Sequence, residues 1–337
     1  MIAAHVVPRP GGLGAQELLV DGRPSILFAL VAGVSLGLMT GQDAPPALGA
    51  PSRPGLPARA EARWRLLIRA LALLALGLGL WLLPHGIAVI LDYYGVMFLL
   101  MIPLLFARRV VLAVVATVVL VAAPLLRDEI VTRGAPETGP LATIVDYLLT
   151  GWYPALLWVP LLAVGLLAAR AGLGSARVRA ALLAGGATAS VAGYGAAAVL
   201  PAAGFAEVDA AAHSGTIAEL LGSGGLAAAV LGLCLVLLDP PTGRAPIGVR
   251  IALAPLSAMG RVALSVYVGQ VLVIAALSPL GGAGRFDGAL GWGILIVLLV
   301  ASTAFALACR ALGRRGPLEW LLTRLADLPF GPRRVRD

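Results

Sequence analysis

The chain contains a series of about nine apolar stretches, each roughly 20 residues long, separated by short polar connections. Because a helix rises 1.5 Å per residue, a stretch of this length crosses the ~30 Å hydrocarbon core of a bilayer. Charged residues make up only 12% of the chain, against about 25% in soluble domains. The stretches are rich in Leu and Ala without period-two alternation, so we predict an all-α polytopic bundle. The expected membrane helices cover 24–41, 64–83, 86–106, 109–126, 150–169, 178–200, 217–238, 256–278 and 290–311.

The arginines indicate an orientation. Lysine is absent, so all 25 basic residues are arginines, and most of them fall on alternate connections. By the positive-inside rule the connection 42–62 and the tail 312–337 are cytoplasmic, while the more acidic segments 127–149 and 201–216 are external. The absence of Lys and Asn suggests a GC-rich bacterial gene, so we expect a multi-pass protein of the bacterial plasma membrane with a cytoplasmic C-terminus.

Net charge and cysteines exclude several classes of function. The charge of +8 belongs to a cytoplasmic collar that faces anionic membrane lipids, and no basic patch with interleaved aromatics predicts nucleic-acid binding. Cys234 and Cys309 fall in expected membrane helices without metal-ligand spacing, so they are interpreted as packing residues and no metal is predicted. We expect one membrane domain, 1–337, with a mobile linker at 42–62 and a basic tail at 312–337.

The first seven residues are apolar and precede a Pro-Arg-Pro-Gly-Gly break. Seven residues cannot span a bilayer, and this segment lacks the features of a signal peptide. We interpret it as the C-terminal stub of a missing first helix that runs outward and ends near His5. The functional protein is therefore expected to begin upstream of Met1.

Ionisable and polar side chains within expected membrane helices are candidates for function. Asp92 lies about seven residues into the helix expected from 86, where it acts, pairs with an arginine or caps a broken helix. Arg261 lies one turn inside the cytoplasmic end of its helix, where snorkelling also explains it. Gln270 lies mid-helix, where bonding to another helix is the alternative.

All three histidines fall at expected outer helix ends or in an outer loop. Histidine is the usual group for taking a proton from a hydroxyl or amine near neutral pH. A surface position explains His85, whereas His213 fits local structure and a site equally well. The spacing from Thr216 to Glu219 predicts a helix capping box, which is as good an explanation of Glu219 as a catalytic role.

Seven short runs spread over almost the whole chain occur in a characteristic order. They are 1–5, 21–33, 93–100, 150–155, 213–219, 255–261 and 316–320. Together they resemble the bacterial relatives of heparan-alpha-glucosaminide N-acetyltransferase, within the transmembrane acyltransferase superfamily. In many members of that superfamily the first helix carries an arginine ten residues before an outer-end histidine, and this histidine assists acyl transfer. The resemblance implies that His5 is this histidine and that Arg23 is the residue at the mouth of the second helix.

The residues and the resemblance together predict a membrane-embedded acyltransferase. It would move an acyl group, expected to be acetyl, from cytoplasmic acyl-CoA to a hydroxyl or amine of a cell-envelope glycan or lipid-linked acceptor. Inner arginines would hold the phosphates of acyl-CoA, His5 would deprotonate the acceptor and Arg23 would stabilise the oxyanion. Asp92 and His213 are the second-rank catalytic candidates, and the donor-binding candidates are Arg108, Arg109 and Arg261.

Two other classes of function stay open at this stage. A transporter or lipid translocator would use Asp92, Arg261 and Gln270 along a pathway, although we find no repeat between the halves of the chain. A noncatalytic membrane subunit would need no acyl donor. Neither class excludes a homo-oligomer.

Overall fold

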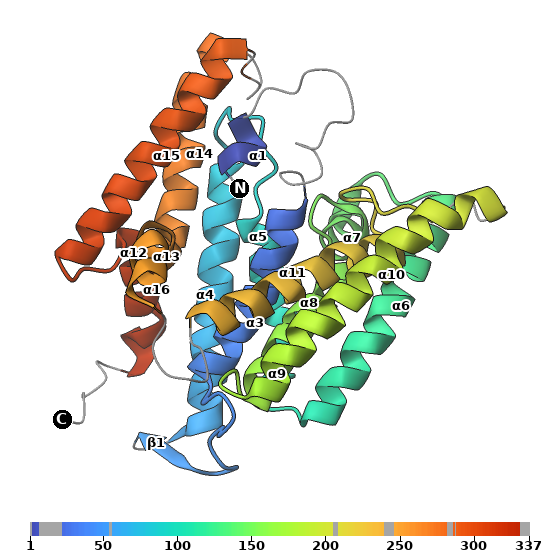
Figure 1. Cartoon of the computed structure of the whole chain (residues 1–337), viewed down its shortest axis with the longest axis horizontal. Helices are drawn as coiled ribbons and strands as arrows, with labels where there is room; N and C mark the ends of the chain where they lie inside the picture. The colour runs from blue at the N-terminus through green and yellow to red at the C-terminus, as the bar shows by residue number, and fades with distance from the viewer. Residues whose placement is uncertain are drawn as a thin grey trace. The chain divides into compact units, whose positions relative to one another are not determined.

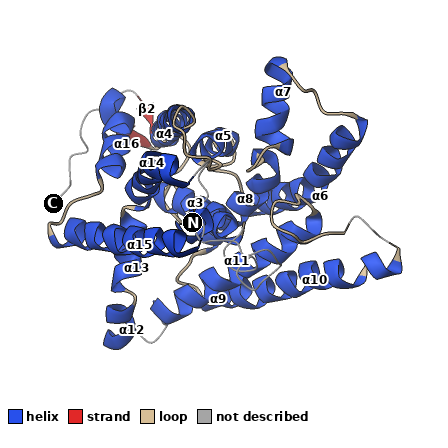
Figure 2. Cartoon of the chain, turned by 90° about the horizontal axis from the view of Figure 1, so that it is seen from above, coloured by secondary structure: helices blue, strands red, loops and turns tan. Residues whose placement is uncertain are grey.

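The computed structural model describes residues 2–6, 22–53, 56–204, 208–238, 246–281, 286 and 288–330. The described chain is helical, apart from a small antiparallel pairing of β1 (Pro51–Arg53) with β2 (Leu56–Pro57), as Figure 2 shows. This confirms the all-α class. The Pro-Gly break expected after residue 7 and residues 331–337 of the tail lie outside the described residues.

The chain divides into two compact units, both within the expected domain 1–337. Unit 1 comprises 1–20, 71–92 and 245–337, and unit 2 comprises 21–70 and 93–244. One long helix, α4 (Ala58–Leu80), contributes residues to both units.

Unit 2 is built from helices that run side by side. Figure 1 shows α10 beside α11, α3 beside α8 and α6 beside α8. Close packing at α3 and α8 depends on glycine, because a Cβ at Gly33 would lie 2.0 Å from the Leu162 carbonyl oxygen. The other elements of unit 2 are shorter helices and turns. The elements are α3 (Arg23–Met39), α5 (Leu91–Met101), α6 (Arg109–Arg133), α7 (Gly139–Val145), η1 (Asp146–Thr150), α8 (Ala155–Ala171), α9 (Ala176–Ala180), η2 (Ala181–Gly185), α10 (Gly186–Val199), η3 (Pro201–Ala203) and α11 (Ile217–Leu238).

Unit 1 is held together by an apolar cluster. The short helix α1 (Ile2–Val6) buries Ile2 and Val6 against Ile274 and Leu298, so the first described residues are part of this core. The other elements are α12 (Ile247–Ala252), α13 (Ala254–Arg261), α14 (Ala263–Gly281), α15 (Gly288–Ala311), α16 (Pro317–Asp327) and η4 (Leu328–Phe330).

Four helices in the described part of the chain are long and apolar enough to cross a membrane, or up to six spans if each of two bent helix pairs counts as one. The four are Arg109–Arg133, Ala176–Val199, Ile217–Leu238 and Leu290–Ala311, and they coincide with expected helices. The helices expected at 24–41 and 86–106 are shorter, since α3 has 17 residues and α5 has 11. The described helices therefore support a membrane protein without confirming nine spans.

The helix expected from residue 86 begins later, at Leu91. A turn precedes it, in which His85 Nε2 bonds the Leu80 carbonyl oxygen at 2.9 Å and His85 Nδ1 accepts the Ile87 N–H at 3.0 Å. His85 is 2% exposed, so the expected surface position is wrong. With Gly86 at φ +61, the chain follows this turn in place of a helix.

The helix expected over 256–278 is broken by 82° between α13 and α14. Arg261 is consequently the exposed last residue of α13, and does not lie one turn inside a continuous helix. The break frees N–H groups at the start of α14, and Glu319 of α16 accepts two of them, from Leu264 at 2.8 Å and Ser265 at 3.0 Å. A carboxylate at a helix N-terminus is favourable, so Glu319 stabilises the break.

Candidate functional site

Arg23 begins α3 and is the first member of a polar chain across three helices of unit 2. Its Nε donates to the Tyr194 hydroxyl oxygen of α10 at 2.9 Å, and its guanidinium lies 5.4 Å from the centre of the Tyr194 ring. The Tyr194 hydroxyl in turn bonds Ser223 Oγ of α11 at 2.9 Å, and Ser223 is buried. Sequence reasoning missed Tyr194 and Ser223. The available signal was a single tyrosine and a single serine within glycine-rich apolar helices.

His213 has the hydrogen-bonding pattern of a general base. Its Nδ1 lies 3.0 Å from the Trp152 carbonyl oxygen. A carbonyl oxygen only accepts, so Nδ1 carries the hydrogen and the lone pair is on Nε2. No group in the described ranges bonds Nε2. The ring also packs edge-on against Trp152 and Tyr153, with ring centres 6.4 Å and 5.5 Å away.

Gly22 brings His213 next to the start of α3. A Cβ placed on Gly22 would lie 2.8 Å from Ala212 Cβ and 3.6 Å from His213 Nε2, and Gly22 has φ +67. Only glycine fits this close approach and this backbone conformation without strain. The structure therefore places His213 against the residue that precedes Arg23, and brings two sequence-predicted candidates to one end of unit 2.

Glu219 shapes the turn that carries His213. Its carboxylate accepts the His213 N–H at 2.6 Å and the Gly215 N–H at 2.7 Å, and its own N–H donates to Thr216 Oγ1 at 3.0 Å. The threonine half of the predicted capping box is confirmed, while the glutamate reaches past Thr216 to the two preceding amides. These bonds hold His213 at φ +65, an uncommon conformation for a residue other than glycine. The geometry favours the structural role of Glu219.

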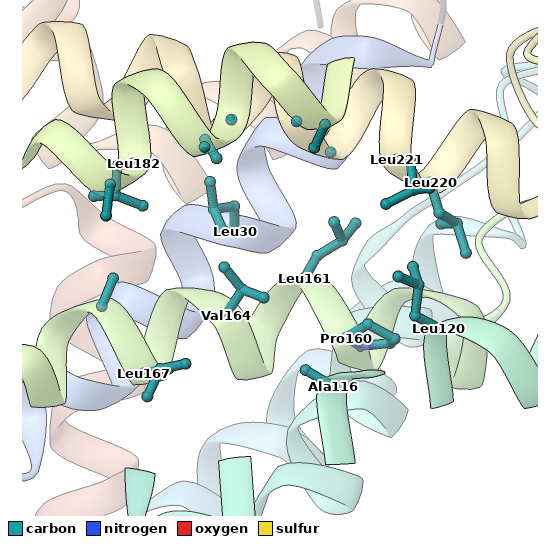
Figure 3. A pocket seen from close by; sticks show the side chains of 18 of the residues that line it. Leu30, Ala116, Leu120, Pro160, Leu161, Val164, Leu167, Leu182, Leu220 and Leu221 are labelled. Atoms are coloured by element: carbon teal, nitrogen blue, oxygen red, sulfur yellow. The ribbon is translucent and has the colours of Figure 1, made fainter. Parts of the chain in front are cut away.

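Unit 2 also has a partly open apolar cavity of about 530 Å³, which is lined by residues of α3, α6, α8 and α9 to α11. Figure 3 shows leucine side chains pointing into it, among them Leu30, Leu161 and Leu220. Among the described lining residues, Thr117 has the only polar side chain. The lining extends along α8 from Pro160 to Ala171, about 17 Å at 1.5 Å per residue. The cavity therefore fits a hydrocarbon chain better than a polar molecule.

The cavity and the polar chain of Arg23, Tyr194 and Ser223 are built on the same helices. Leu30 lies seven residues after Arg23, two turns along the same face of α3. On α11, the lining residue Leu220 directly follows Glu219. The described lining itself contains none of Arg23, Tyr194, His213 and Ser223.

His5 belongs to a separate polar group in unit 1. The Gln270 amide donates from Nε2 to His5 Nδ1 at 3.1 Å, and the Tyr267 ring lies edge-on to His5 with ring centres 6.3 Å apart. The Tyr267 hydroxyl oxygen accepts the Ile90 N–H at 3.1 Å. Gln270 is 2% exposed, and among the described residues its Oε1 has no hydrogen-bond partner. Because Nδ1 accepts a hydrogen bond, Nε2 of the His5 ring carries the hydrogen and is a donor.

Asp92 is also in unit 1, in the first turn of α5 and not seven residues into a helix. It is 1% exposed, and its Oδ2 accepts the Trp81 indole N–H at 3.0 Å. His5 and Asp92 thus belong to unit 1, and Arg23 and His213 to unit 2. A site that combines His5 with Arg23 stays a prediction.

The donor-binding candidates lie at exposed helix ends. Arg108 and Arg109 lie at the start of α6, and Arg261 at the end of α13. Over the described ranges no cluster of three or more His, Cys, Asp or Glu side chains could hold a metal ion.

Comparison with known families gives one match. Residues 167–329 match the family described as "Protein of unknown function (DUF418)". The matched region covers less than half of the chain and includes Tyr194, His213, Ser223 and Gln270, but not His5, Arg23 or Asp92. No curated protein and no solved structure matched the chain.

Proposed function

We propose that this protein is a membrane-embedded acyltransferase that moves an acyl group, with acetyl as the expected case, from acyl-CoA to a hydroxyl or amine of a cell-envelope acceptor. One observation carries the proposal: His213 has Nδ1 bonded to a backbone carbonyl and Nε2 open, beside the start of α3 with its Arg23. A fixed imidazole and a nearby cation are the groups that acyl transfer requires.

The reaction follows from the roles of these two residues. The acceptor O–H or N–H gives its proton to His213 Nε2 as the oxygen or nitrogen bonds the thioester carbonyl carbon. The positive charge of Arg23, oriented by Tyr194, stabilises the negative charge on the carbonyl oxygen. The C–S bond then breaks, and the proton passes from Nε2 to the departing sulfur. The products are the acylated acceptor and free CoA.

The apolar cavity favours a lipid-linked acceptor over a free glycan. A lipid chain spans one leaflet, about half of the ~30 Å core, which is close to the length of the cavity along α8. In this proposal the chain occupies the cavity and the polar group to be acylated lies at the Arg23 end. The proposal includes a nine-span topology in the bacterial plasma membrane, with the C-terminus in the cytoplasm.

Transfer of label from radiolabelled acetyl-CoA tests the function in membranes that contain the protein. We expect label in the lipid fraction, and its loss in His213→Asn, because Asn tolerates the positive φ but cannot act as a base near neutral pH. Asp209→Asn is the matched control, since its side chain keeps an acceptor for the Ala211 N–H in the same loop. Full activity of His213→Asn would contradict the role of His213.

The resemblance gives the base role to His5, so His5→Ala is measured alongside. Loss in His5→Ala with full activity in His213→Asn would return the role to His5. The absence of acetyl-CoA consumption by the unmodified protein would reject the enzyme. A lipid translocator is the second candidate, favoured by the 82° break between α13 and α14, since broken membrane helices are common in transporters.

A further inference from the structure

Three arginines of unit 2 surround one aromatic ring. The guanidinium carbons of Arg59, Arg63 and Arg170 lie 5.1, 5.7 and 5.8 Å from the centre of the Phe106 ring. Each distance is within the ~6 Å range of cation–π attraction, so the three charges are no farther apart than about twice that distance. The ring follows α5, two arginines come from the start of α4, and the third comes from the end of α8.

The buried member of this arginine cluster is held in place by backbone oxygens. Arg170 is 3% exposed, and its Nη2 donates to the Leu105 carbonyl oxygen at 2.7 Å and to Thr40 Oγ1 at 2.6 Å. Its Nη1 donates to the carbonyl oxygens of Thr40 and Gln42. Its Nε is buried without a hydrogen-bond partner among the described residues. These bonds fix the charge of Arg170 without neutralising it, because every acceptor is uncharged.

The other two arginines are more open. Arg59 is half-buried and uses Nε to bond the Pro46 carbonyl oxygen at 2.7 Å. Arg63 is exposed and lies one turn further along α4. Like charges at this spacing on a helix are destabilising, so local helix stability does not explain the pair.

No carboxylate within the described ranges forms an ion pair with these three arginines. On the same helix the Glu61 carboxylate is taken by Arg65, at 2.7 Å. The nearest other acid along the chain, Asp43, lies close to the cluster without an ion pair to it: its Oδ2 would be 3.7 Å from a Cβ at Gly172, two residues after Arg170. The cluster therefore concentrates three positive charges that the described protein leaves without an anionic partner.

We infer that Arg59, Arg63 and Arg170 form a binding site for a phosphate group. The planar fork of arginine donors matches phosphate oxygens, and charge-assisted bonds of this kind are strong. Arg59 and Arg63 supply these bonds, whereas Arg170, whose Nη hydrogens already bond the protein, contributes its charge. A purely structural role explains the backbone bonds of Arg170, but it does not explain why two further cations share its ring. The phosphate belongs either to a soluble nucleotide such as CoA or to a lipid headgroup, and both present the same chemistry to the cluster.

Binding to the purified full chain tests the site without requiring turnover, so its failure is separable from failure of the acyltransferase proposal. One arm measures the Kd for CoA, with pantetheine, which lacks phosphate, as the reference ligand. The other arm measures the shift in thermal unfolding when phosphatidic acid replaces phosphatidylcholine in nanodiscs. Arg63→Gln and Arg59→Gln are the test variants. Arg133→Gln is the matched control, because it removes an equal charge from an exposed arginine outside the cluster. Arg133 is the last residue of α6 and pairs with Glu129.

We expect Arg63→Gln to weaken binding in one arm by roughly tenfold or more, as for the loss of a hydrogen bond between charged groups, while Arg133→Gln changes it little. Arg63→Lys should retain part of the binding, because it keeps the charge without the fork. If the variants weaken only the binding of CoA, the site binds a nucleotide. If they reduce only the shift in thermal unfolding with phosphatidic acid, the site binds a lipid headgroup. If neither arm distinguishes Arg63→Gln and Arg59→Gln from Arg133→Gln, the inference is wrong.

Discussion

Gly193 is the residue at which a single added methyl group should separate two helices of the candidate site. A Cβ at this position would lie 2.3 Å from the Gly222 amide nitrogen and 2.6 Å from the Ala218 carbonyl oxygen. Favourable contacts of carbon begin near 3.5 Å, so in Gly193→Ala helix α10 has to move away from α11 by about 1 Å. Both atoms are backbone atoms, which no side-chain rotation can displace.

The cost of this movement has two parts. Overpacking of a close helix contact costs about 1–3 kcal/mol. The movement also stretches the 2.9 Å hydrogen bond between Tyr194 and Ser223, which contributes about 1 kcal/mol. We expect Gly193→Ala to lose roughly 2–4 kcal/mol of unfolding free energy and to melt about 3–6 °C lower. Loss of orientation at Tyr194 should also reduce acyl transfer, because Tyr194 holds Arg23.

Gly195 provides the matched control on the same helix. A Cβ there has no atom within 4 Å, so Gly195→Ala should be stabilising by about 0.5–1 kcal/mol through helix propensity. Thermal unfolding of both purified variants in detergent, followed by tryptophan fluorescence, gives the comparison. If Gly193→Ala melts as high as Gly195→Ala, the close approach of α10 and α11 is wrong.

Two further predictions concern the cavity and the orientation in the membrane. Ala189→Phe places a large side chain at the cavity lining and should lower crosslinking of a photoactivatable acyl lipid to the protein several-fold. Ala187→Phe, exposed on the same helix, is the control and should not lower it. Equal crosslinking in both variants would show that the cavity holds no lipid chain. With Cys234 and Cys309 replaced, an impermeant thiol reagent should label Glu137→Cys but not Leu48→Cys in intact cells, and labelling at 48 would reverse the proposed orientation.

The structure also shows why some predictions from the sequence succeed and others fail. The helices Ile217–Leu238 and Leu290–Ala311 coincide with long apolar stretches, where hydropathy along the chain is sufficient, whereas Arg109–Arg133 continues past the expected end at 126 into charged residues. The prediction at 86–106 is wrong at its start, because the bonds of His85 to Leu80 and Ile87 favour a turn. The break between α13 and α14 depends on Glu319, more than 50 residues away in sequence, and no local pattern announces it.

The candidate site divides in the same way. The sequence offers His213 only as a second-rank candidate for proton transfer, behind His5, and Arg23 comes from the family resemblance. The sequence does not show that Trp152 orients the His213 ring, or that Tyr194 and Ser223 extend from Arg23. It selects Arg108, Arg109 and Arg261 as the arginines that bind the donor, and no sequence pattern shows that Arg59, Arg63 and Arg170 share the ring of Phe106.

The sequence by itself determined the environment of this protein and its helical class, because the free energy of placing residues in a bilayer adds up along a continuous stretch of chain. The tertiary structure decided which helices touch and which polar side chains meet. Lipid is as apolar as the helix surfaces, so no hydrophobic force selects partners within the membrane. Close backbone approach at residues such as Gly33 and Gly193, together with specific hydrogen bonds, makes that selection, and these depend on residues far apart in the chain.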